Sequence, residues 1–118
     1  MVHSNGNVGI GTVTPSYKLS VNGNIRSKEV VVESGWADYV LHDDYKLRSL
    51  DEVEKYIATH KHLPNIPSAK AIDQEGLQLG DMQKRMMEKI EELTLYLIRQ
   101  EKKINELQRA LRENSINK

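Results

Sequence analysis

The chain has 118 residues, no cysteine and no phenylalanine, and its 17 Lys and Arg balance its 17 Asp and Glu. Balanced, interspersed charge argues against a broad basic surface for nucleic acid or an anionic membrane. Without cysteine there is no disulfide, thiolate nucleophile or Cys-ligated zinc site. No apolar run approaches the length of a membrane span, and the N-terminus lacks a signal-peptide layout. We therefore expect a soluble protein that needs oligomerisation for stability, because a chain this small buries little apolar surface alone.

Short β-strands are predicted in residues 1–34, a zone rich in Gly, Asn, Ser, Thr and Val. β-Branched residues interrupted by Asn-Gly turn dipeptides place these strands at 8–10, 19–21 and 25–32. Strands this short and few do not form an independent sheet, so we expect them to pair with copies from other chains. Gly9 and Gly11 flank Ile10 and suit close packing of backbones near a shared axis.

A small collar of loops and short helices is predicted for residues 35–80. Ser49 and Glu52 fit a capping box, in which the Ser caps the helix and the Glu reaches back. This helix is expected to stop before residues 60–63, because Pro64 follows and disfavours helical backbone in the residue before it.

The rest of the collar leads into a long helix. The two prolines at 64 and 67 predict an extended, stiff connector over 62–67. A second short helix, 69–75, is predicted between a Ser68 cap and Gly76. Asp81 is expected to cap the long helix of residues 81–118.

Residues 81–118 carry a heptad pattern of almost four repeats, in which apolar residues recur at alternating steps of four and three. Position a holds Ile90, Leu97, Ile104 and Leu111, and position d holds Met86, Leu93, Gln100 and Leu107. A lone helix has nothing to bury this narrow seam against, so the seam predicts partner helices. Mixed Ile and Leu at position a with Leu at position d slightly favours a coiled coil of two helices. The heptads alone therefore do not separate a dimer from a trimer.

Further apolar residues lie outside the seam in the first half of this helix: Met82, Met87, Leu95, Tyr96 and Ile98. They predict that the collar packs around this half. Its expected contributors, from the same or a neighbouring chain, are Trp36, Tyr39, Leu50, Val53, Ile57 and Leu63. From Arg99 onward only the seam is apolar, so that half is expected to stand bare in solvent.

Gln100 is the one polar residue among the seam positions named above. A polar layer costs stability but penalises wrong registers and wrong numbers of helices. In a symmetric parallel trimer, three Gln side chains could bond to one another, or to an ion or water on the axis. The alternative is a tolerated weak layer near the outer end.

The order of motifs resembles a known fibre family. Residues 7–25 are similar to the NVGIGT-x-x-P-x-x-K-L-x-V-x-G-x-I segment of phage and bacterial tail-fibre proteins. Downstream stand GWADYV at 35–40, YKL at 45–47, SLDEVE at 49–54, HLPNIPS at 62–68 and KIEELTLYLI at 89–98. The combination resembles the C-terminal tip of fibre-like proteins of Bacteroidetes and their phages. More distantly, it is similar to the intramolecular chaperone that closes endosialidase-type tailspikes.

This resemblance implies an α+β fold in an intertwined homotrimer. Each chain would contribute a fibre-type β segment (1–34), a small loop and helix collar (35–80) and one helix (81–118) of a parallel three-helix coiled coil. The trimer core would consist of Met86, Ile90, Leu93, Leu97, Gln100, Ile104, Leu107 and Leu111. The implied location is a virion tail fibre or an extracellular appendage, with fibre upstream in the same chain.

No catalytic, cofactor-binding or metal-binding residues are predicted, and we expect no enzyme. The chaperone relatives cleave themselves at a Ser assisted by a Lys, and the nearest counterparts here are Ser27 and Lys28. Adjacent side chains on a strand point to opposite faces, so we do not predict autoproteolysis. The acidic pairs at 43–44 and 91–92 fit solvated charge runs.

Four residues form a possible recognition surface: Trp36, Tyr39, His60 and His62. The two histidines are two residues apart, a spacing from which both could bind one metal ion. No third ligand lies nearby in the sequence, so a role in loop packing or helix termination is the favoured interpretation. Trp36 and Tyr39 suit stacking on a sugar, although a role for Trp36 as anchor of a small core is favoured.

Three functions compete. The first is a structural trimerisation and folding tip that sets chain register at the distal end of a fibre. The second is a receptor-binding tip that recognises a host surface glycan or protein, which is compatible with the first. The third, a DNA-binding zipper, is discounted because residues 76–83 lack the basic helix that it requires.

Overall fold

The computed structural model describes residues 1–33, 35–36 and 38–116. It contains two short strands, a single 3-10 turn and three helices, which confirms the predicted mixture of strands and helices. The chain divides into two compact units, Met1–Val31 and Val32–Lys118, and each is described by itself below.

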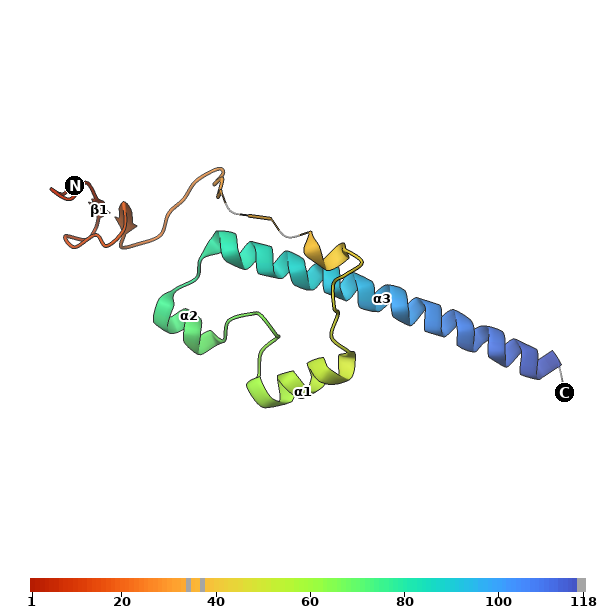
Figure 1. Cartoon of the computed structure of the whole chain (residues 1–118). Helices are drawn as coiled ribbons and strands as arrows, with labels where there is room; N and C mark the ends of the chain where they lie inside the picture. Colours follow the sequence, from red (N-terminus) through yellow and green to blue (C-terminus); the bar gives the residue numbers. More distant parts are fainter. Residues whose placement is uncertain (34, 37, 117–118) are drawn as a thin grey trace. The chain divides into compact units, whose positions relative to one another are not determined.

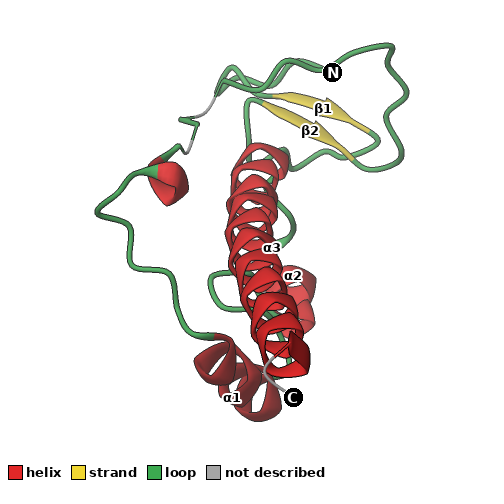
Figure 2. Cartoon of the chain, turned by 90° about the vertical axis from the view of Figure 1, so that its right-hand side faces the viewer, coloured by secondary structure: helices red, strands yellow, loops and turns green. Residues whose placement is uncertain are grey.

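The first unit is built on two parallel strands. β1 (Val8–Ile10) pairs with β2 (Leu19–Val21), with Val8 opposite Leu19 and Ile10 opposite Val21 (Figure 2). We expected these strands to pair with copies from other chains, whereas they pair with each other. The loop of residues 11–18 is long enough to bring β2 back alongside β1.

Two asparagine side chains hold this loop closed. Parallel strands usually need a crossover of about a dozen residues, so a shorter loop requires extra ties. Asn7 Nδ2 donates a hydrogen bond to the Pro15 carbonyl at 3.1 Å, and Asn22 Nδ2 donates to the Gly11 carbonyl at 3.2 Å. A Cβ on Gly9 would lie 2.4 Å from the carbonyl oxygen of Thr12, so only glycine fits there. The backbones do approach closely at Gly9, and they do so within one chain.

The third predicted strand, at 25–32, does not form. The structure places no strand in these residues, and Ile25 and Val31 are exposed. β-Branched residues favour extended backbone, but a strand also needs a neighbour to pair with.

The second unit contains the helices: η1 (Tyr39–Leu41), α1 (Leu50–His60), α2 (Ala69–Glu75) and α3 (Leu79–Ile116). Two of the three predicted N-caps are confirmed, because Ser49 Oγ accepts from the Glu52 amide at 3.2 Å and Ser68 Oγ accepts from the Ala71 amide at 3.1 Å. Gly76 ends α2 with a φ of 80°, as predicted.

Two local predictions are wrong. α3 begins at Leu79, so Asp81 lies in its first turn, where its carboxylate pairs with Arg85 at 2.9 Å. The connector is not extended, because Asn65 adopts a φ of 64° and the Ile66 amide donates to the Leu63 carbonyl at 3.2 Å. The proline before Asn65 fixes only its own φ and the backbone of its predecessor, which leaves Asn65 free to turn the chain.

The collar elements are arranged along the first half of α3. η1 packs directly on α3, and α1 and α2 reach it through side chains that line cavities. The second half of α3 extends away from the other helices (Figure 1). The described residues beyond Arg99 are exposed on every side of the helix.

Candidate functional site

The seam of α3 is open to solvent along its whole length. Its apolar members are 52% to 68% exposed: Met86, Ile90, Leu93, Leu97, Ile104, Leu107 and Leu111. Gln100 is exposed as well. A continuous exposed apolar stripe of this kind marks an interaction surface.

A single chain has almost no apolar core. Among the described residues, Val40 is the only buried Val, Leu, Ile, Met or aromatic side chain, and two prolines, Pro15 and Pro64, are buried as well. Most of the apolar surface is therefore left for something else to cover.

The face of α3 that meets the collar carries two buried carboxylates, Glu88 (5% exposed) and Glu92 (7% exposed). Glu88 Oε2 accepts hydrogen bonds from Tyr39 Oη at 2.9 Å and Asn65 Nδ2 at 2.8 Å. Lys89 Nζ lies 2.8 Å from Glu92 Oε1 and 3.9 Å from Glu88 Oε1. The buried charges are thus paired and hydrogen-bonded, as burial requires.

Two further hydrogen bonds attach the collar to α3. Tyr96 Oη donates to the Arg48 carbonyl at 2.6 Å, and Arg85 Nη1 donates to the Asn65 carbonyl at 3.0 Å. Both donors lie outside positions a and d. Because the collar uses another face of the helix, it leaves the seam uncovered.

The prediction of solvated acidic pairs is wrong for the pair at 91–92, because Glu92 is buried and Glu91 is half-buried with its Oε2 enclosed. The prediction that the extra apolar residues meet the collar is supported for Tyr96, and Met82, Met87 and Leu95 are half-buried. Ile98 is 44% exposed, so one chain alone does not supply its predicted contact. The sequence does hold a signal for the carboxylates, because Glu88 and Glu92 lie four residues apart on one helix face, next to apolar positions. Their partners could not be found from it, since the Tyr39 and Asn65 donors are remote in the chain.

Three tyrosines lie close to this acidic face. Burial of the phenol, the hydrogen bond to Glu88 and the charge of that carboxylate raise the pKa of Tyr39 to about 12. Burial and the neighbouring carboxylates, Glu92 first among them, raise the pKa of Tyr45 and of Tyr96 as well. The protonated phenols therefore belong to the folded state.

These shifts predict a loss of stability at alkaline pH. A phenol whose pKa is raised on folding contributes stability that is complete below pH 10 and disappears as pH rises toward 12, because the unfolded chain loses its proton first. The free energy of unfolding should fall over this interval in urea titrations, and it should fall less steeply for Tyr39→Phe. An equal slope in the two proteins would contradict the assignment.

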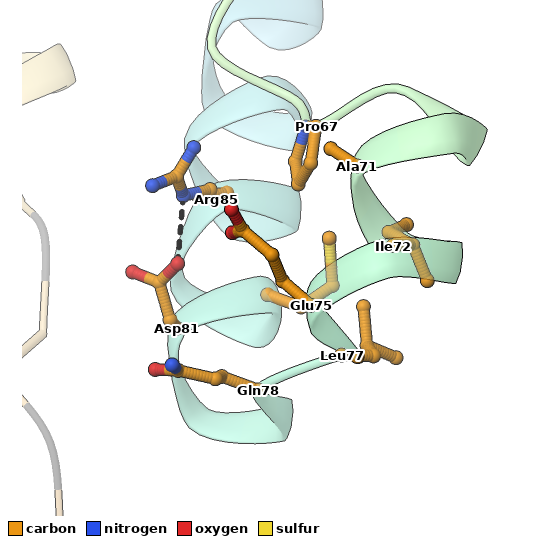
Figure 3. A pocket seen from close by; sticks show the side chains of 10 residues that line it. Pro67, Ala71, Ile72, Glu75, Leu77, Gln78, Asp81 and Arg85 are labelled. Atoms are coloured by element: carbon orange, nitrogen blue, oxygen red, sulfur yellow. Dashed lines mark ion pairs between the residues drawn. The ribbon is translucent and has the colours of Figure 1, made fainter.

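A cavity of about 390 Å³ lies between α2 and the start of α3 (Figure 3). Its lining is mixed: Ile72 and Leu77 are apolar, whereas Glu75 and the Asp81–Arg85 ion pair are charged. The Arg85 guanidinium is already engaged by Asp81 and the Asn65 carbonyl, so no unpaired cation stands ready for an anion.

The predicted recognition residues fall in two places. His60 and His62 gather around Tyr56, with ring centroids 4.2 Å and 5.6 Å from the tyrosine ring, and the Arg48 guanidinium lies 5.5 Å from that ring. Trp36 is 60% exposed, so its favoured role as a core anchor is not met within one chain. Tyr39 is bound to Glu88 rather than presented to a ligand.

Ser27 and Lys28 are exposed and lie outside the strands, so the strand geometry used to discount autoproteolysis does not apply. In the part of the chain that the structure describes, no three His, Asp or Glu side chains gather as a metal site would require. Within the same residues, every helix is too short or too polar to cross a lipid bilayer. Comparison with protein-family models, curated proteins and solved structures gives no match to this chain.

Proposed function

We propose that this protein is a structural trimerisation tip of a fibre, in which three parallel chains join through the seam of α3. The observation that supports this most directly is the open seam, on a helix whose other face is already occupied by the chain's own collar. The tip would set the register of the chains, so that fibre-type segments such as the first unit lie at equal heights. The expected setting is a virion tail fibre or an extracellular appendage.

The length of the helix favours this role. α3 spans 38 residues, which at 1.5 Å per residue gives about 57 Å. Isolated helices owe little of their stability to propensity, and a helix exposed on all sides in its second half needs packing to persist. Partner helices along the seam would supply it.

Parallel alignment is supported by Gln100. Parallel chains in register bring these residues into one layer, where the amides can bond one another. Antiparallel chains would set each Gln100 against apolar seam residues and leave its polar groups unpaired. The number three comes from the resemblance to fibre tips.

The mass in solution tests the proposal. Light scattering at micromolar concentration should give three times the 13.5 kDa of the chain. A monomer would overturn the assembly itself, and a stable dimer would overturn the trimer. Spin labels at one end of α3 should report short distances between chains only if the helices are parallel.

Gln100→Leu should raise the melting temperature, because it replaces a polar layer with an apolar one. It should also make the assembly less specific for three chains. Sedimentation equilibrium would then show a mixture of dimer and trimer masses. A loss of more than about 1 kcal/mol in unfolding free energy would instead mean that Gln100 forms a satisfied buried network.

A second candidate function is recognition of a host surface glycan or protein. The exposed aromatic side chains favour it, namely Trp36 and the group of His60 and His62 around Tyr56. Glycan-array and cell-binding measurements separate the two functions, because a purely structural tip binds nothing. Alanine at Trp36 and His60 should abolish any signal without changing the mass of the assembly.

A further inference from the structure

An apolar cavity of about 110 Å³ opens beside the seam of α3, between that helix and α1. Its lining includes Leu50, Val53, Leu63, Leu93 and Tyr96. Leu93 belongs to both the cavity and the seam and is more than half exposed, so the two apolar surfaces are continuous. A helix docked on the seam of this chain would therefore also border the cavity.

The heptad positions identify which residues of a neighbouring copy reach the cavity. Lys89 and Tyr96 line it from two successive g positions. In a parallel coiled coil, a g residue faces the e residue five positions further along the next chain. The neighbour's Thr94 would thus lie across from Lys89, and its Glu101 across from Tyr96.

Thr94 and Glu101 of the neighbouring chain suit the surfaces that they would contact. The hydroxyl of Thr94 donates to the Ile90 carbonyl of its own helix at 2.9 Å, which leaves its methyl group for the apolar cavity. Tyr96 Oη holds the Arg48 carbonyl at 2.6 Å, so Arg48 stands where the neighbour's Glu101 would arrive. Arg48 and Glu101 are exposed, and neither forms a salt bridge with another described residue of its own chain. The Arg48 guanidinium lies 5.5 Å from the centroid of the Tyr56 ring, so a salt bridge to Glu101 would either add to that contact or replace it.

We propose that the collar of each chain is a docking surface for α3 of the neighbouring copy. The cavity takes Thr94 of that copy, and Arg48 pairs with its Glu101. This inference rests on the proposed parallel assembly and goes beyond it, because the seam alone would join the helices without any contact between a collar and a second chain. The collar would then link two chains and fix the direction in which they follow one another around the axis.

Cross-linking between separately labelled chains tests the contact, and the absence of native cysteine makes it simple. One full-length chain carries Arg48→Cys, and a second chain with a longer tag carries Glu101→Cys. The two are unfolded together, refolded and treated with a short bismaleimide. A third chain with Glu106→Cys, an exposed position c residue on the same helix, is the matched control.

The cross-link between unlike chains should form roughly tenfold faster with Glu101→Cys than with Glu106→Cys, because proximity raises the effective thiol concentration. Equal rates in a mixture that light scattering shows to be oligomeric would overturn this inference and leave the proposed assembly intact. A monomeric mixture would overturn both. Because the two cysteines are on different chains, no contact within one chain can produce the product.

A charge exchange provides a second measurement on the same pair. Arg48→Glu and Glu101→Arg should each lower the melting temperature at low salt, and the double variant should recover most of that loss. Arg48→Glu combined with Glu106→Arg should not recover it. A double variant that is as unstable as the two single changes added together would contradict the pairing.

Discussion

Leu97→Asp is expected to convert the assembly into monomers at micromolar concentration. Leu97 lies at position a, is 68% exposed in the single chain and takes no part in the contacts between the collar and α3 described above. Burying a leucine contributes about 1.5–3 kcal/mol, and an unpaired carboxylate in its place adds a desolvation cost of several kcal/mol. In a trimer, three such carboxylates would meet in one layer and repel one another.

Ile98→Asp is the matched control, since the neighbouring residue loses a side chain of the same size but lies at position b. Sedimentation equilibrium should show monomer for Leu97→Asp and the parent mass for Ile98→Asp. Helicity by circular dichroism should fall with the mass, because the second half of α3 has no other packing. An unchanged mass for Leu97→Asp, or equal dissociation of the two variants, would show that the seam is not the surface through which the chains assemble.

Glu88→Ala is expected to lower the free energy of unfolding by about 2 kcal/mol, since hydrogen bonds to a charged group contribute about 1.5–3 kcal/mol. The change removes the acceptor of the Tyr39 hydroxyl and of the Asn65 amide, and both residues are exposed enough to recover part of the loss by turning to water. Glu88→Gln keeps an acceptor oxygen and should cost less, about 1 kcal/mol, through the lost charge. Urea unfolding at a fixed protein concentration measures both.

Glu106→Ala serves as the surface reference for this series, because Glu106 is exposed on the second half of α3. Its effect should stay within about 0.5 kcal/mol. The assignment of Glu88 as the anchor of the collar would be wrong if Glu88→Ala matched Glu106→Ala. It would also be wrong if alanine and glutamine at position 88 had the same effect.

The local parts of the fold follow from the sequence because their causes are local. Ser49 and Ser68 cap helices through the third residue after them, and Gly76 ends α2 with a backbone conformation that other residues rarely adopt. The alternation at 8–10 and 19–21 likewise identified both strands. Each of these signals operates within a few residues.

The errors arise where distant residues decide the outcome. Asn65 turns the connector, and its side chain meets Glu88, which lies on another element. From its place in the sequence, Glu92 is expected to be a surface charge. In the structure it is buried, because it pairs with Lys89 and faces the collar. The parallel pairing of β1 and β2 depends on Asn7 and Asn22, whose amides reach the loop between the strands. Such contacts have no periodicity, so the sequence pattern does not reveal them.

The near absence of an apolar core in one chain has a calorimetric consequence. The heat capacity change of unfolding grows with the apolar surface that becomes exposed to water. Among the described residues of a separated chain, most apolar side chains are half-buried or exposed already, so that chain buries less apolar surface than the assembly would. If the chains assemble as proposed, covering the seam adds apolar surface that only their separation exposes. The heat capacity change per chain should then be larger for the assembly than for a dissociated variant such as Leu97→Asp, and the curvature of stability with temperature reports on association as well as on the fold of the single chain.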